Sequence, residues 1–210
     1  MKLYHYWQSS ASWRVRWALA IKGIPFESVM IDLRAGVQHS AEHRARSPNG
    51  SIPVLELDDG RRLTESVAIL EYLDETHPEP PLYPRGDAWL MARTRQIVEL
   101  VNAGTQPLQN PIVLARAASD DAGKRAFAAF FNERGMRALE TVLGETAGRF
   151  AVGDSLSAAD LCVVPQVSGA RRWGVQMEQF PKVLAVEAAA LATPHAAGAL
   201  PANQPGAPQP

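Results

Sequence analysis

The first 76 residues alternate between short apolar runs and segments whose apolar residues recur at helical spacing. The apolar runs have the length and composition of buried strands. Strands are therefore predicted at 3–7, 27–31, 54–57 and 62–64, and helices at 12–22 and 66–76. No element is predicted for the polar segment 34–47. A βαβ start followed by ββα indicates a compact mixed sheet with helices, an α/β domain.

A proline-rich stretch at 77–84 is unsuited to a helix or a central strand and is predicted to be a stiff linker. The chain beyond it has helical spacing almost throughout. Helices are predicted at roughly 88–117, 121–148, 157–170 and 181–192. The expected domains are 1–82 and 88–200. The last segment, 201–210, holds four prolines and no charge, and is expected to be a disordered tail.

Two prolines interrupt the predicted helix 88–117. Pro107 and Pro111 are expected to bend it. The bend would place the amide side chains of Gln106, Gln109 and Asn110 on the wall of a groove, or leave them exposed to solvent.

The sequence Ser157-Ala158-Ala159-Asp160 has the spacing of a helix capping box. Asp160 is therefore interpreted as a structural cap rather than a catalytic acid.

Composition narrows the class of protein. The 210 residues are 46% hydrophobic and 20% charged, with a net charge of −1, which is typical of a globular protein. No basic excess points to nucleic acid. No apolar run approaches the roughly 20 residues that span a bilayer, so no membrane partner is expected. The N-terminus lacks a secretory pattern, and a cytoplasmic location is the default expectation.

Cysteine and histidine usage excludes several kinds of site. Cys162 is the single cysteine, which rules out an internal disulfide, a CxxC redox pair and a cysteine-based zinc site. His39 and His43 are spaced for a metal on a helix, but no third ligand lies nearby in sequence. We therefore predict no metal site.

The junction between the first strand and the first helix carries the most chemistry. Ser9, Ser10 and Ser12 place three hydroxyls where unpaired helix amides and the positive end of the helix dipole attract an anion, such as a thiolate. The chain supplies no thiol here, so a thiolate would come from a ligand. The alternative is that these serines only cap the helix, with Ser10 or Ser12 as the cap and Gly23 ending it.

Two further sites fit that junction. A cis bond at Ile52-Pro53 would leave the Ile52 backbone free to pair with an extended peptide. Ser66 is expected to cap the next helix and to hold a ligand carboxylate, while Glu65 could accept an ammonium group. Each feature alone is common. Together they predict a pocket for a peptide that carries an α-amino acid end and a thiol.

These features resemble the zeta class of glutathione transferases, which includes maleylacetoacetate and maleylpyruvate isomerases. The resemblance runs from Met1 to about residue 190. It rests on Ser-Ser-x-Ser-Trp-Arg-Val-Arg at 9–16, Ile52-Pro53, Glu65-Ser66, Gln-Pro-Leu-Gln-Asn at 106–110 and the pattern over 152–167. It implies an α/β thioredoxin-like N-terminal domain, an all-α C-terminal domain, a homodimer and glutathione as cofactor.

The resemblance also implies residue roles. Ser9 would hold the thiolate, with Ser10 and Ala11 completing its surroundings, and Arg172 would face the carboxylates of the second substrate. The alternative for Arg172 is a solvated helix end. The rest of glutathione would be bound by Gln38, Ile52, Pro53, Glu65, Ser66, Gln106 and Asn110. The family usually has Cys where this chain has Ala11, and many members have a basic residue in place of Gln8.

The activity that the resemblance implies is glutathione-dependent isomerisation of maleylacetoacetate to fumarylacetoacetate. Three alternatives stay open. They are maleylpyruvate isomerisation, conjugation or dehalogenation of an electrophile, and a non-catalytic glutathione-binding module.

Overall fold

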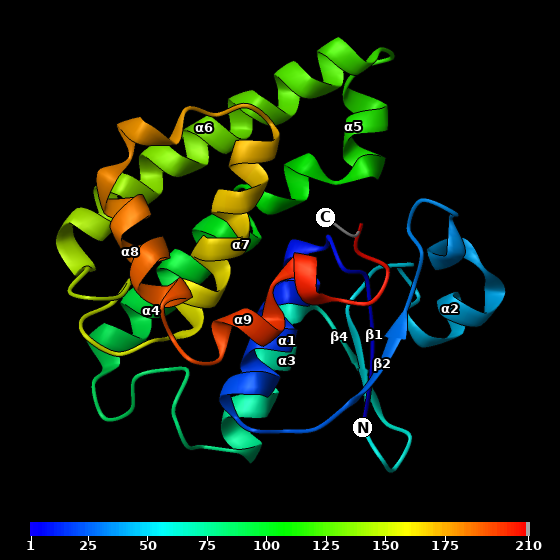
Figure 1. Cartoon of the computed structure of the whole chain (residues 1–210), viewed down its shortest axis with the longest axis horizontal. Coiled ribbons are helices and arrows are strands. Elements are labelled where there is room, and N and C mark those ends of the chain that lie inside the picture. The colour runs from blue at the N-terminus through cyan, green and yellow to red at the C-terminus, as the bar shows by residue number, and fades with distance from the viewer. Residues whose placement is uncertain (209–210) are drawn as a thin grey trace. The chain divides into compact units, whose positions relative to one another are not determined.

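The computed structural model describes residues 1–208. The chain forms two compact units. The first contains Met1–Leu82 together with the chain from Pro194 onward, and the second contains Tyr83–Thr193. Figure 1 shows strands in the first unit and helices alone in the second.

The first unit is built on a four-stranded mixed sheet in the order β2-β1-β3-β4. Strand β1 is parallel to β2 and antiparallel to β3, and β4 is antiparallel to β3. The elements are β1 (Lys2–His5), α1 (Ser10–Ile21), β2 (Glu27–Met30), a 3₁₀ turn (Val37–His39), α2 (Ala41–Arg46), β3 (Val54–Glu56), β4 (Arg62–Thr64) and α3 (Ser66–Thr76). This arrangement confirms the predicted α/β fold; the short helix α2 had not been predicted.

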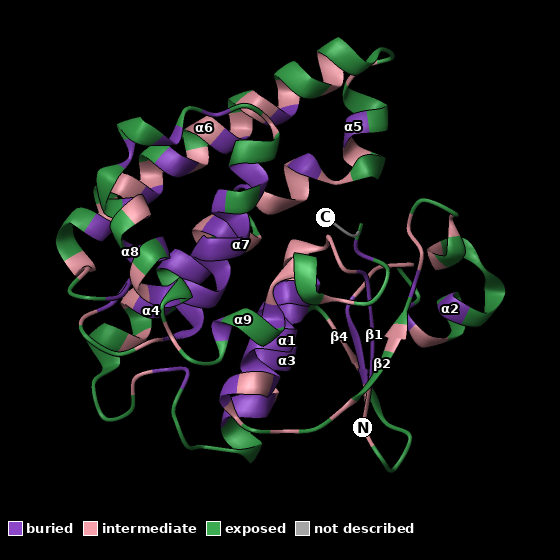
Figure 2. Cartoon of the chain, viewed as in Figure 1, coloured by how far each residue is buried: buried purple, intermediate pink, exposed green. Residues whose placement is uncertain are grey.

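The core of this unit lies on both faces of the sheet. Helices α1 and α3 pack against each other, and Trp17 and Leu70 are among their fully buried side chains. A second cluster joins Tyr4, Ile31 and Val54. Figure 2 shows β1 and α1 as largely buried elements. Strand β1 therefore ends inside the unit, where His5 and Tyr6 are buried.

The ends of α1 differ in part from expectation. Ser9 is the N-cap, and its Oγ accepts a hydrogen bond from the Ser12 amide at 3.1 Å. The expectation that Ser10 or Ser12 caps the helix is therefore wrong, although a serine does cap it. Gly23 follows the helix with φ +64°, as its position predicted.

The C-terminal segment also differs from expectation. Helix α9 (Ala196–Ala199) packs on α1, and a 3₁₀ turn follows at Pro201–Asn203. Asn203 and Gln204 side chains donate to backbone carbonyls, and Ala207 is buried. The predicted tail disorder is therefore wrong for 201–208, and 209–210 lie outside the described residues. Residues 194–200 belong with the first unit and not with the helical domain.

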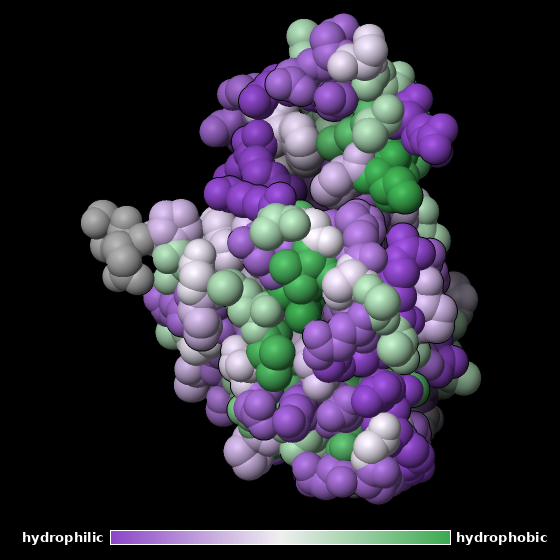
Figure 3. All heavy atoms as spheres, turned by 90° about the vertical axis from the view of Figure 1, so that its right-hand side faces the viewer, coloured by the Kyte–Doolittle hydropathy of each residue, from purple (hydrophilic) through white to green (hydrophobic). Residues whose placement is uncertain are grey.

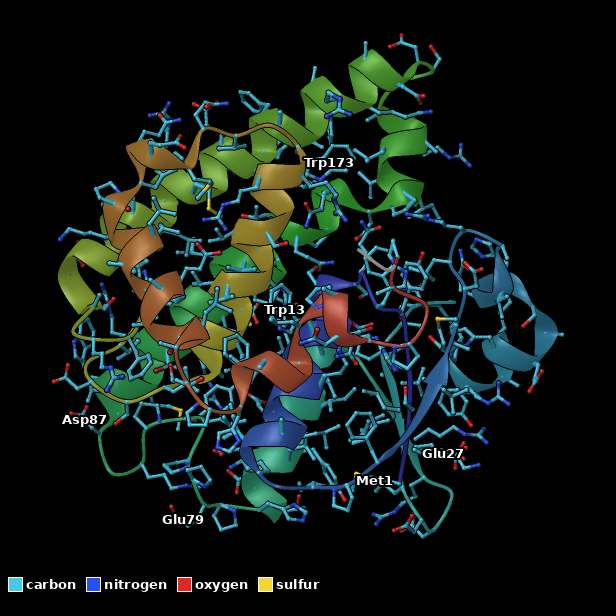
Figure 4. The ribbon with its side chains drawn as sticks, viewed as in Figure 1. Met1, Trp13, Glu27, Glu79, Asp87 and Trp173 are labelled. Carbon is cyan, nitrogen blue, oxygen red and sulfur yellow. The ribbon has the colours of Figure 1, made fainter. Side chains whose placement is uncertain are left out.

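The second unit is entirely helical in its regular structure. Its elements are α4 (Ala88–Asn102), a 3₁₀ turn (Gln106–Gln109), α5 (Pro111–Ala117), α6 (Asp121–Thr146), α7 (Ala158–Arg172), a 3₁₀ turn (Met177–Gln179) and α8 (Pro181–Leu191). Asp87 caps α4 by accepting from two amides, and Figure 4 labels it at the start of that helix. Helix α7 packs against α4, α6 and α8, and Figure 2 shows it buried along most of its length.

The predicted bend at the prolines is a complete break. Pro107 lies in the 3₁₀ turn and Pro111 begins α5, so 88–117 forms two helices with a turn between them. A proline at the first helical position loses no hydrogen bond, which explains why α5 restarts there.

Asp160 is the structural cap that its spacing predicted. It is fully buried. Its carboxylate accepts from the Ser157 amide at 2.9 Å, the Ser157 hydroxyl at 3.0 Å and the Ala151 amide at 2.8 Å. Because these contacts occupy the carboxylate, a role as a catalytic acid is not supported.

The surface of the first unit carries scattered apolar side chains. Met30 and Val37 are its exposed large hydrophobic residues in the described chain. In Figure 3 hydrophilic residues cover much of the face in view, with hydrophobic ones in small groups. Within residues 1–208, no helix is both long and apolar enough to span a bilayer.

Candidate functional site

The N-terminus of α1 holds the residues that the sequence singled out as an anion-binding site. Ser9, Ser10 and Ala11 are half-buried there, in the first turn after β1. The Ser9 Oγ accepts from the Ser12 amide, so the Ser9 hydroxyl keeps its own proton to donate. Helix α1 has no acidic residue in its first turn, which leaves its positive end unneutralised.

The turn before β3 has the geometry that the sequence suggested. The Ile52-Pro53 bond is cis. The pairing of β3 with β1 begins at Val54, so Ile52 lies outside the ladder. Its backbone can therefore pair with an extended ligand.

The start of α3 carries the second pair of candidate residues in the same unit, Glu65 and Ser66. Glu65 precedes the helix at φ +64°, and among residues 1–208 it is the one non-glycine residue with positive φ. Ser66 is the first helical residue and is buried, so the expectation that it caps α3 is wrong. Arg14 Nη1 donates to Ser66 Oγ at 3.1 Å. Since that contact uses an oxygen lone pair, the Ser66 proton remains available to a ligand carboxylate.

Gln38 lies in the 3₁₀ turn after β2. Its Nε2 donates to the Leu33 carbonyl at 3.4 Å and lies 3.2 Å from His39 Nε2. Its Oε1 is buried and has no hydrogen-bond partner in the described chain. An orphaned buried acceptor is costly, and a ligand donor would satisfy it.

The remaining amide candidates lie in the second unit. Gln106 Nε2 donates to Asn110 Oδ1 at 3.2 Å, and both side chains are half-buried.

Gln109 does not line a groove as expected, because it is buried in a closed ring of amides. Gln109 donates to Gln166, Gln166 to Asn132, and Asn132 to Gln109. Trp173 Nε1 also donates to Gln109 Oε1 at 2.9 Å, and Figure 4 places Trp173 at the end of α7. This ring fixes the turn that carries Gln106 and Asn110.

The two arginines at the end of α7 have different surroundings. Arg171 forms a bidentate ion pair with Glu187, whose Oε2 lies 2.6 Å from Arg171 Nη2. Arg172 has no carboxylate partner in residues 1–208, and its guanidinium lies 5.5 Å from the Trp173 ring. Arg172 is thus the arginine whose donors are available to an acid.

Sequence reasoning missed the roles of Arg14 and Arg16. Both are buried on α1 although arginine is rarely buried. Arg14 contacts Ser66, and Arg16 contacts His5 at the end of β1 and the Tyr6 carbonyl just beyond it. The sequence did place two arginines among the apolar residues of the predicted helix 12–22, which could have indicated buried cations with polar partners.

The contact between His5 and Arg16 makes the first unit sensitive to acid. Arg16 Nη1 lies 3.2 Å from His5 Nδ1. Because a guanidinium donates and cannot accept, Nδ1 is the unprotonated nitrogen of the neutral ring. The proton of His5 is therefore on Nε2, which lies 2.6 Å from Ser28 Oγ. Burial, and then the positive charge of Arg16, lower the pKa of His5 from 6.5 to about 4.

We expect stability to fall as the pH falls from 6.5 toward 4, because the unfolded chain then binds a proton that the folded chain refuses. At about 1.4 kcal/mol per pKa unit the loss is about 3 kcal/mol. Urea unfolding across this range should give a steeper pH dependence for the native protein than for His5→Asn. The exposed His195→Asn variant serves as the control. Parallel curves for the native and His5→Asn proteins would contradict the assignment.

Residues 1–208 contain no cluster of three or more His, Cys, Asp or Glu side chains that could hold a metal ion.

A cavity of about 340 Å³ lies where β1, β2 and α2 meet, but none of the candidate residues lines it. Its charged residues pair with one another, Lys2 with Glu27 and Arg46 with Glu42.

Comparison with known proteins identifies relatives of the whole chain. The family described as "Glutathione S-transferase, N-terminal domain" matches residues 8–76. A maleylacetoacetate isomerase of Dictyostelium discoideum is 44% identical over 210 residues, which cover 98% of this chain and 95% of that protein.

Solved structures agree with this result. The maleylacetoacetate isomerase of Anaeromyxobacter dehalogenans 2CP-1, solved with GSH bound in the active site, is 46% identical with a TM-score of 0.90, over 99% of this chain and 97% of that one. The holo structure of a maleylpyruvate isomerase, described as a bacterial zeta-class glutathione transferase, is 33% identical with a TM-score of 0.93, over 99% and 100% of the two chains.

Proposed function

This chain belongs to the zeta class of glutathione transferases, and on that premise we propose that it isomerises a maleyl-type keto acid from cis to trans with glutathione as cofactor. The observation that carries the proposal is the unneutralised start of α1, where Ser9 keeps a proton to donate and the chain supplies no thiol of its own. Such a site favours the thiolate form of a bound thiol.

The proposed reaction needs no external oxidant or acid. The glutathione thiolate, stabilised by the Ser9 hydroxyl and the first amides of α1, adds to the cis double bond. The π electrons move onto the conjugated carbonyl as an enolate, and the former double bond rotates as a single bond. The enolate then re-forms the double bond as trans and expels the thiolate, so glutathione is unchanged.

The remaining candidate residues bind the two ends of the reactants. We propose that Ser66 donates to the γ-glutamyl carboxylate of glutathione while Glu65 accepts from its ammonium group. Ile52 pairs with the peptide backbone, and Gln38, Gln106 and Asn110 supply further hydrogen bonds. Arg172 binds a carboxylate of the acid and stabilises the developing enolate.

Product analysis tests the proposed function. We expect maleylacetoacetate to be converted to its trans isomer with catalytic glutathione and no loss of thiol. If maleylpyruvate is the preferred substrate, the protein is instead a maleylpyruvate isomerase. The likeness to the 33% identical maleylpyruvate isomerase supports this second candidate activity. Stoichiometric loss of glutathione on an electrophile, without isomerisation, would instead identify a conjugating transferase.

The buried hydroxyl of Ser66 gives a specific prediction. Ser66→Ala should weaken glutathione binding by about 1.5–3 kcal/mol, because a hydrogen bond to a charged carboxylate is lost. Titration calorimetry would measure the change, with Ser40→Ala, at the start of α2, as a control for serine removal at a helix N-terminus. Unchanged affinity would remove Ser66 from the proposed site.

We also propose that the protein is a homodimer and acts in the cytoplasm. Trp89 and Leu90 at the start of α4 are 68% and 40% exposed, and a second copy would cover such side chains. Sedimentation as two chains would support this assembly, and a monomer would overturn it. A cytoplasmic location suits a reaction that requires glutathione as a free thiol.

A further inference from the structure

The Arg16 guanidinium is buried and uses every N–H donor that it has. Its Nε and Nη2 donate to the Ala199 carbonyl, both at 3.3 Å, and Nη2 also donates to the Trp7 carbonyl at 3.2 Å. Its Nη1 donates to the Tyr6 carbonyl at 3.3 Å and to His5 Nδ1. A guanidinium has five such donors in a fixed plane, and lysine has three on a flexible stem. The arrangement is therefore specific to arginine.

Two of these acceptors lie in the turn that leads to Ser9. The Tyr6 carbonyl accepts from Arg16 and also from the Ser9 amide, at 3.1 Å. The Ser9 carbonyl in turn accepts from the Trp13 amide at 2.9 Å. Ser9 is thus joined to Arg16 through one shared carbonyl oxygen, and a displacement of that oxygen would move Ser9.

The third carbonyl comes from the C-terminal segment, 183 positions away along the chain. Helix α9 packs on α1, where Ala199 is buried. Further on, a Cβ placed at Gly206 would lie 3.8 Å from the Trp7 ring and 2.3 Å from Met30 Sδ, so this segment also lies against the turn. The C-terminal segment therefore contacts the turn from a second side.

We propose that Arg16 is a positioning residue for the thiolate site and that the Ala199 carbonyl completes its clamp on the turn before Ser9. The inference rests on the proposed function of Ser9. Arg16 contacts neither glutathione nor the acid; it holds the Ser9 hydroxyl at the distance at which a thiolate is stabilised. A small displacement of a donor is enough to weaken such an interaction.

The Arg16→Lys variant tests this role through the thiol itself. We expect the pKa of bound glutathione, followed by ultraviolet thiolate absorbance, to rise by about one unit, which lowers turnover at pH 7 by up to about tenfold. The KM for glutathione should change little. Turnover should recover as the pH is raised above the new pKa, because the thiolate then forms without help. General loss of structure would not be reversed by raising the pH.

Lys22 offers a matched control on the same helix. Its buried ammonium group, at the far end of α1, binds Asp74 and the carbonyls of His77 and Pro80. Lys22→Met should lower the melting temperature, as Arg16→Lys does, but leave the thiol pKa unchanged.

A second pair of variants acts on the acceptor and leaves Arg16 intact. Ala199→Leu overfills a buried position and should shift α9 with its carbonyl, raising the thiol pKa in the same direction. Ala197→Leu places the same side chain at an exposed position of α9 and should have no effect. This pair decides the question if Arg16→Lys does not fold.

The outcomes separate the inference from the function beneath it. If the native protein does not lower the thiol pKa of bound glutathione, the role of Ser9 fails and that of Arg16 fails with it. The second outcome is that the native protein lowers the thiol pKa of bound glutathione as expected. If Arg16→Lys and Ala199→Leu then lower this pKa as much as the native protein does, the inference about Arg16 is overturned and the role of Ser9 stands. An equal shift in Lys22→Met would also overturn it.

Discussion

Ser9→Ala is expected to reduce turnover at pH 7 by roughly ten- to a hundredfold, because a hydrogen bond to a charged sulfur contributes about 1.5–3 kcal/mol. The loss should appear as a higher pKa of bound glutathione, with little change in its affinity. Thiolate absorbance titrated against pH measures the first, and calorimetry the second. The Ser9 hydroxyl is the donor in question because its oxygen already accepts from the Ser12 amide.

Two controls make the Ser9 result specific. Ser9→Ala also removes the N-cap of α1, which costs about 1 kcal/mol of stability. Ser40 caps α2, and its Oγ accepts from the His43 amide at 3.1 Å. Ser40→Ala should therefore cause a similar loss of stability without a loss of turnover. If Ser10→Ala shifts the thiol pKa and Ser9→Ala does not, the roles of the two serines must be exchanged.

Arg172→Ala is expected to depress isomerisation of a maleyl-type acid on the order of a hundredfold, since a charged donor is removed where negative charge develops. Conjugation of a neutral electrophile, such as a nitroaryl halide, should be spared because it carries no carboxylate. Steady-state kinetics on both substrates measure the contrast. Equal losses on both would indicate a defect in folding or in glutathione binding.

The neighbouring arginine provides the control for Arg172. Arg171→Ala breaks the bidentate pair with Glu187 and should lower the melting temperature while the ratio of the two activities stays unchanged. If Arg171→Ala abolishes isomerisation selectively and Arg172→Ala does not, the assignment at the end of α7 must be reversed.

The sequence determined the features that depend on neighbours close along the chain. Apolar spacing located the strands and most helices, and Gly23 marked the end of α1. The capping box at Asp160 was predictable because its partners lie within nine positions. That a serine would begin α1 was also predictable, since a strand, a serine cluster and a helix start are consecutive.

Only the tertiary structure decided which polar groups meet. Arg14 reaches Ser66 across 52 positions, and Arg16 reaches Ala199 across 183. Gln109 turns into a buried amide ring because Asn132 and Gln166 come from other helices. Helix α9 packs on α1, and the carbonyl of Ala199 accepts from the buried guanidinium of Arg16. The spacing of residues along the chain does not predict such partners, because a buried polar group forms hydrogen bonds with residues that are distant in sequence and become neighbours only in the folded structure.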